Sequence, residues 1–95
     1  MVIDFDKKSL LYSHYFWENY DQSDPRVSGR LQDIAFNRKS GPEVLHLIRV
    51  LMILWGLETK EGGQKIERMI HNYLPTNITT QYSVKTWIIL NWKNY

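Results

Sequence analysis

The sequence predicts an all-α protein, a compact bundle of four to five helices around one central apolar helix. Apolar side chains recur at helical spacing in several segments, and an acceptor side chain close before proline marks a helix start in two places. Segment 42–57 becomes apolar on nearly every side, which is typical of a helix covered by others. Ninety-five residues with 43% hydrophobic composition suit one packed core, so we expect residues 1–95 to form a single helical domain.

The first predicted helix runs from Asp4 or Asp6 to about Tyr20. Either aspartate can accept hydrogen bonds from the free amides of a first helical turn. The segment carries many aromatic and aliphatic side chains, including Tyr12 and Trp17, and these spread beyond a single helical stripe. We therefore expect this helix to cover others.

The second predicted helix runs from Pro25 to about Asn37. Asp24 stands at the cap, and Pro25 stands at the first helical position, where its missing amide costs nothing. A narrow apolar stripe follows, with Val27 and Leu31 one turn apart.

The central helix is predicted from Pro42 to about Leu57, after a second start signal of the same kind at Ser40. One face carries Val44, Leu47, Ile48, Leu51 and Trp55. The opposite side begins polar, but further along the helix Ile53 and its neighbours make it apolar. We expect the rest of the chain to cover this second half; a homodimer seam is the alternative explanation.

The glycine pair after Glu61 predicts a break, followed by a helix from about Gly63 to Leu74 and a short turn at Pro75. Residues 82–92 fit two patterns, a helix or an alternating strand. A strand needs a pairing partner, and only residues 1–5 resemble one. We choose the helix and keep an α+β fold with a C-terminal strand as the alternative.

No group of residues indicates catalysis, so we expect a protein that is not an enzyme and has no metal or cofactor. Cysteine is absent, and no glycine-rich phosphate loop occurs. His14 and Glu18 are four residues apart, but two ligands do not make a metal site, and His46 and His71 have no ligand at a recognised spacing. The start of the chain lacks the pattern of a signal peptide, and no apolar segment is long enough to span a membrane. We expect a cytoplasmic protein without a membrane partner.

Aromatic residues make up 14% of the chain, more than one small core is expected to bury. Tryptophan and tyrosine anchor protein interfaces when they reach the surface. We therefore predict a small regulatory or inhibitory protein-binding module whose partner is another protein or a second copy of the chain. The candidate partner-binding residues are Tyr12, Trp17, Tyr20 and Trp92.

A helix-turn-helix DNA-binding regulator built from residues 63–95 is the second hypothesis. The chain is mildly basic from Thr59 onward, and the two helices predicted there are joined by a short turn. The residues expected to face bases or phosphates are Gln81, Tyr82, Lys85 and Thr86. The second helix has no arginine to read guanine, and the net excess of three positive charges from Thr59 onward offers little attraction for a phosphate backbone. DNA therefore ranks behind a protein partner.

Overall fold

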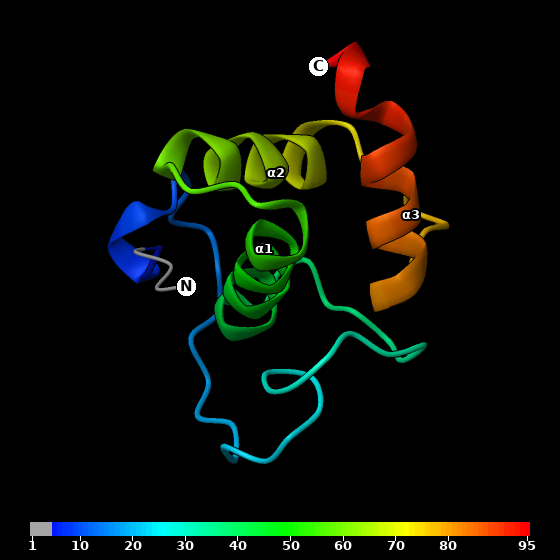
Figure 1. Ribbon diagram of the computed structural model, residues 1–95. Helices are drawn as coiled ribbons and strands as arrows, with labels where there is room; N and C mark the ends of the chain where they lie inside the picture. Colours follow the sequence, from blue (N-terminus) through cyan, green and yellow to red (C-terminus); the bar gives the residue numbers. More distant parts are fainter. Residues whose placement is uncertain (1–4) are drawn as a thin grey trace.

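Helix α1 (Gly41–Trp55) lies at the centre of the fold, with α2 (Lys60–Asn72) and α3 (Gln81–Asn91) on two of its sides (Figure 1). The computed structural model describes residues 5–95, and within them these three are the α-helices, together with two single 3-10 turns, η1 (Lys7–Ser9) and η2 (Trp92–Asn94). Residues 10–40 pass around the remaining sides of α1 as an irregular chain (Figure 1). The protein is mostly helical, as predicted, but the prediction of four to five helices is wrong.

Helix α1 begins and ends at local signals that the sequence displays. The Ser40 hydroxyl accepts a hydrogen bond from the Glu43 amide at 3.3 Å, and Pro42 lies in the first turn. Gly56 ends the helix in the left-handed conformation, with φ of +64°. The predicted bounds are confirmed to within two residues.

The covering of α1 differs from the prediction. Val44, Leu47, Ile48 and Leu51 are fully buried, as expected of the core face. On the other side, however, Ile53 is 54% exposed and Leu54 is 56% exposed. The expectation that the chain covers the second half of α1 all round is therefore wrong, because the segments expected to supply two more helices are not helical.

The helix predicted from Asp4 or Asp6 to Tyr20 is replaced by the single turn η1 and an extended chain. Asp6 does cap that turn, accepting from the Lys8 amide, whereas Asp4 lies outside the described residues. Beyond the turn, the backbone amides of Leu11 and Tyr12 donate to a side chain on α2 instead of to a preceding helical turn. The segment is also rich in aromatic, Ser, His and Asn residues, whose helix propensity is modest.

The helix predicted from Pro25 to Asn37 is likewise wrong. Asp24 starts only one turn, and Gly29 then takes a left-handed conformation with φ of +70°. Further along, the Gln81 amide donates to the Ile34 carbonyl at 2.9 Å, in a short antiparallel bridge between residues 35 and 80. These backbone groups are therefore satisfied by a distant segment.

Helix α2 begins at Lys60, three residues before the predicted start, so the expected break at the glycine pair is wrong. Gly63 lies inside the helix, where the ring of Phe5 comes so close that an added Cβ would be 2.5 Å from its Cε2 atom. The glycine serves close packing at this position instead of breaking the helix. Ile66, Met69 and Ile70 form the buried face of α2.

Residues 81–91 form helix α3, so the helix prediction is confirmed and the alternative of a C-terminal strand is wrong. Thr80 and Ser83 form a capping box at its start. Val84 and Ile88 are fully buried beneath α3. Of the proposed strand partner, residues 1–4 lie outside the described part. In residues 5–95, no helix has the length and apolar character needed to cross a membrane.

Candidate partner-binding groove

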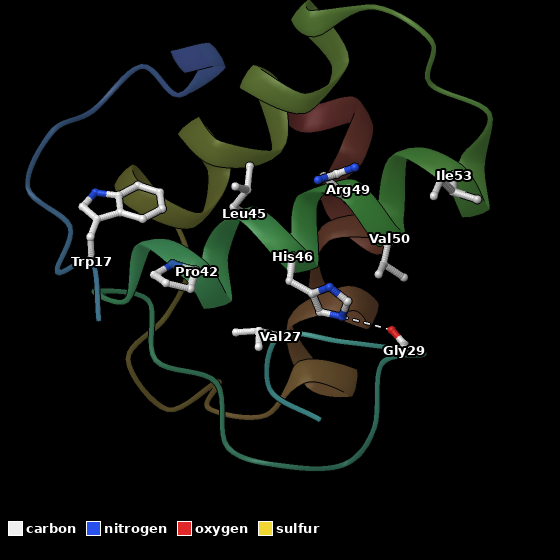
Figure 2. Close-up of a pocket in the computed structure, with 9 residues that line it drawn as sticks. All are labelled: Trp17, Val27, Gly29, Pro42, Leu45, His46, Arg49, Val50 and Ile53. Carbon is white, nitrogen blue, oxygen red and sulfur yellow. Dashed lines mark hydrogen bonds between the residues drawn. The ribbon is translucent and has the colours of Figure 1, made fainter. Parts of the chain in front are cut away.

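A groove of about 510 Å³ follows one side of α1 (Figure 2). The helix contributes positions spaced by three and four residues, which share one face of an α-helix. Two irregular segments form the walls, one containing Trp17 and the other containing Val27 and Gly29 (Figure 2). The lining residues are Trp17, Val27, Gly29, Pro42, Leu45, His46, Arg49, Val50 and Ile53.

Trp17 is held against the start of α1 and remains 37% exposed. Its indole packs on Gly41, where an added Cβ would lie 2.5 Å from the ring. The ammonium nitrogen of Lys7 lies 4.4 Å from the ring centroid, a cation–π geometry. One part of the ring is thus packed while another part is open to the groove.

Two buried carboxylates fix the chain on either side of Trp17. Glu67 on α2 accepts from the Tyr15 hydroxyl at 2.6 Å, in addition to the two backbone amides described above. Glu43 on α1 accepts from the Tyr20 hydroxyl at 2.8 Å. Trp17 therefore lies between two anchored tyrosines, which positions its indole without the help of a helix.

His46 joins the opposite wall to the floor of the groove. Its Nε2 atom lies 3.0 Å from the Gly29 carbonyl oxygen (Figure 2). Because that oxygen can only accept, Nε2 carries the proton and donates. Burial lowers the pKa of His46 below its usual 6.5, so the neutral ring is favoured near neutral pH.

A smaller hollow of about 140 Å³ lies next to the groove, between α1 and α3, and shares Val50 with it. Arg30 and Lys85 line this hollow, and Arg49 lines the groove itself. No aspartate or glutamate lines either hollow. Among residues 5–95, the single ion pair joins Arg26 to Asp24, so these three cations have no ion-pair partner in the described chain.

A second hollow of about 530 Å³ lies beside α3, and its lining residue Leu90 is 75% exposed. Asp33, Thr86 and Trp87 also line it. Its one charged lining residue is acidic. The α1 groove is the better candidate because both of its walls are tied to the helix that forms its floor.

Of the four predicted partner-binding residues, only Trp17 lines this groove. Tyr12 stacks on His71 with ring centroids 3.9 Å apart, and the Tyr20 hydroxyl is bonded to Glu43 and Ser40. Trp92 packs edge-on against Trp55 near the other end of α1. The structure does not bring these aromatic residues together in one surface.

The four residues predicted to contact DNA are also divided. Gln81 is fully buried and accepts from the Gln32 amide at 2.8 Å, so the expectation that its side chain faces a nucleic acid is wrong. Tyr82 and Thr86 are exposed on α3, and Lys85 is half-buried. The eight residues 73–80 separate α2 from α3, more than the three or four that join the helices of a helix-turn-helix. The predicted turn at Pro75 is present, since the Ile78 amide donates to the Pro75 carbonyl at 3.2 Å, but it is only part of this longer connection.

Sequence reasoning identified the apolar surplus of α1 but not the groove that it forms. Leu45, Val50 and Ile53 lie on one side of the helix wheel together with His46 and Arg49. This combination of aliphatic and basic residues on one helix face was the feature of the sequence that could have indicated a groove. Glu67 gave no signal, because a lone glutamate on a helix usually faces solvent. Within residues 5–95, no three histidine, aspartate or glutamate side chains are close enough to hold a metal ion.

No protein-family model, curated protein or solved structure matches this chain.

Proposed function

We propose that this protein is a non-catalytic, regulatory or inhibitory protein-binding module that receives a segment of its partner along the α1 groove. The observation that supports this most directly is the clamped, 37% exposed indole of Trp17 at the end of an apolar groove. Tryptophan is enriched among the residues that dominate binding energy, especially where it is already fixed before binding. A fixed side chain loses little conformational entropy when a partner covers it.

The dimensions of the groove favour a polypeptide over a small molecule. Pro42 and Ile53, both lining residues, are eleven positions apart in α1, which corresponds to about 16 Å along the helix axis. An open trough of this length suits about three turns of a helix lying alongside α1. The exposed side chains of Ile53 and Leu54 would lose water on contact with such a segment.

The chemistry of the lining offers little support for an enzyme. Hydrolytic and proton-transfer sites place a nucleophile or carboxylate within reach of a base. Here the only histidine of the groove is bonded to a backbone carbonyl, and no aspartate, glutamate or serine lines the surface. We therefore assign the groove to binding.

The proposal is tested by affinity capture from the protein's own cells, with bound proteins identified by mass spectrometry. Trp17→Ala and Ile53→Asp each change the groove, whereas Tyr73→Ala changes an exposed aromatic residue on a surface outside the groove. We expect a set of proteins that the wild type and Tyr73→Ala retain and that both groove variants lose. Circular dichroism should show unchanged helicity in all four proteins. Retention of the same proteins by all four would contradict the proposal.

DNA binding has weaker support, since only Tyr82, Lys85 and Thr86 remain available on α3. A phosphate-binding surface makes affinity for duplex DNA fall steeply with salt. The alternative predicts that the wild type retards duplex DNA in a gel at low salt and that Lys85→Glu abolishes the shift. A wild type that leaves DNA unretarded at low salt eliminates it.

A further inference from the structure

We propose that the segment bound in the α1 groove is an acidic amphipathic helix of another protein, with apolar side chains on one face and carboxylates beside them. This inference rests on the proposed function and specifies the chemistry of the partner. It follows from the distribution of charge along the groove, the shape of its floor and the composition of the chain's own helices.

The charged side chains that line the groove and the hollow next to it are all basic. Arg49 lies on the floor of the groove, while Arg30 and Lys85 line the neighbouring hollow, which shares Val50 with the groove. Their lack of an ion-pair partner within residues 5–95 leaves them available for one on a ligand. Carboxylates of a bound segment would form charge-assisted hydrogen bonds with these cations, and a guanidinium can bind a carboxylate through two parallel bonds.

The rest of the lining is apolar and suits a helix that has one hydrophobic face. Leu45, Val50 and Ile53 present aliphatic side chains at intervals along α1, and Trp17 closes one end (Figure 2). A helix lying in such a groove inserts residues spaced by three and four positions. A partner therefore needs an apolar stripe for the floor and acidic flanks for the cations.

A second copy of this chain is a poor source of such a helix. In the three α-helices, Glu43 and Glu67 are buried and bonded to tyrosine hydroxyls, which leaves Glu61 as the only exposed carboxylate. DNA would satisfy the cations but not the aliphatic floor, which a phosphate backbone cannot cover favourably. The charge and the apolar surface together favour an acidic segment of a different protein.

Two synthetic peptides of about 16 residues test this directly. Both carry leucine at helical spacing on one face; the first has glutamate at the flanking positions, and the second has lysine there instead. Fluorescence anisotropy of the labelled peptides measures binding to the 95-residue protein. We expect the glutamate peptide to bind at least about tenfold more tightly than the lysine peptide, with an affinity that falls as salt rises.

A pair of charge reversals assigns the binding to the groove. Arg49→Glu reverses a cation of the groove floor, and Arg68→Glu makes the same change in net charge at an exposed position of α2 outside the groove. We expect Arg49→Glu to weaken binding of the glutamate peptide at least about tenfold and to improve binding of the lysine peptide. Arg68→Glu should change both affinities less than about twofold.

Several outcomes would overturn the inference. Equal affinities for the two peptides, no binding of the glutamate peptide, or equal effects of the two charge reversals would each show that groove cations do not select an acidic helix. Light scattering that gives a dimer, with the mass halved by Ile53→Asp, would show that a second copy occupies the groove. Tighter binding to phosphatidylserine vesicles than to the glutamate peptide, lost in Arg49→Glu, would identify a lipid surface as the occupant.

The two proposals fail in different ways. If cellular proteins depend on Trp17 and Ile53 for capture but the glutamate peptide binds no better than the lysine peptide, the binding function stands and only the acidic partner is wrong. If neither groove variant changes which proteins are captured, the assignment of the groove as the binding site is wrong, whatever affinities the two peptides show.

Discussion

Glu67 is the residue that holds the irregular N-terminal chain in place. Its carboxylate is fully buried on α2 and accepts from the Leu11 amide, the Tyr12 amide and the Tyr15 hydroxyl. A buried carboxylate is costly unless hydrogen bonds replace its hydration, and here three donors from one short segment supply them. One side chain therefore attaches to α2 the segment that leads to Trp17.

The Tyr15 hydroxyl makes the stability of this attachment sensitive to alkaline pH. Burial, and after it the hydrogen bond to Glu67, raises the pKa of Tyr15 well above its ordinary 10.0. Above about pH 10 the unfolded chain loses the Tyr15 proton while the folded protein keeps it, so the folded state is favoured less as pH rises. The contribution of Tyr15 to the free energy of unfolding is therefore complete below about pH 10 and is lost progressively above it.

Tyr15→Phe should lower the free energy of unfolding by about 1–2 kcal/mol near neutral pH, because Glu67 loses a donor. Urea unfolding between about pH 9 and pH 11 should then show a shallower loss of stability in the variant than in the wild type. Tyr82→Phe, at an exposed tyrosine, serves as the control and should leave the alkaline slope unchanged. Identical slopes in wild type and Tyr15→Phe would contradict this assignment.

Among the helices, α2 contains two adjacent glycines with different surroundings. A Cβ added at Gly63 would lie 2.5 Å from the Phe5 ring and 2.8 Å from the Met52 sulfur, both in the core. A Cβ added at Gly62 would meet the half-buried Leu57 side chain at 3.1 Å, a smaller overlap. Replacing a helical glycine by alanine gains about 0.5–1 kcal/mol where space permits, so packing decides the sign at each site.

Gly63→Ala should lower the free energy of unfolding by about 1–3 kcal/mol, because the overlap displaces Phe5 and Met52 and outweighs the gain in helix propensity. Gly62→Ala should cost less than Gly63→Ala. Urea unfolding of both variants measures the difference. A Gly63→Ala protein as stable as Gly62→Ala would show that the ring of Phe5 does not pack against α2 in this way.

The molecule as a whole leaves part of its central helix uncovered. Described residues from all three helices share one core, and the Cα radius of gyration is 12.2 Å, close to the value of about 12 Å typical of a domain of this length. Residues 10–40 contribute few buried side chains, among them Tyr15, Leu31 and Phe36. Part of the apolar surface of α1 therefore remains in contact with water, and the groove lies on that part.

Two substitutions on α1 distinguish its covered side from its open side. Leu51 is fully buried, so Leu51→Asp should cost more than about 4 kcal/mol and abolish the cooperative unfolding transition of so small a protein. Ile53 is 54% exposed, so Ile53→Asp should change the free energy of unfolding by less than about 1 kcal/mol. Circular dichroism and urea unfolding provide the measurement. An equal loss of stability in both variants would mean that α1 is covered all round, as the sequence pattern suggested.

Neighbouring residues alone were enough to predict the helix with clear ends. Ser40 and Pro42 start α1 and Gly56 stops it. Residues 82–92, by contrast, fitted both a helix and a strand, and only the lack of a strand partner favoured the helix that became α3. The signals at the ends of α1 act over one or two turns, because capping bonds and backbone conformation depend on residues close in the chain. The apolar excess of α1 was visible for the same reason.

Distant contacts settled the conformation of residues 10–37 and with it the groove. The Leu11 amide finds its acceptor in Glu67, 56 residues away, and the Ile34 carbonyl finds its donor in Gln81. Helix patterns assume that such backbone groups pair within their own segment, and they fail where a distant group forms the bond instead. Trp17 faces an open side of α1 because these long-range bonds keep its segment extended.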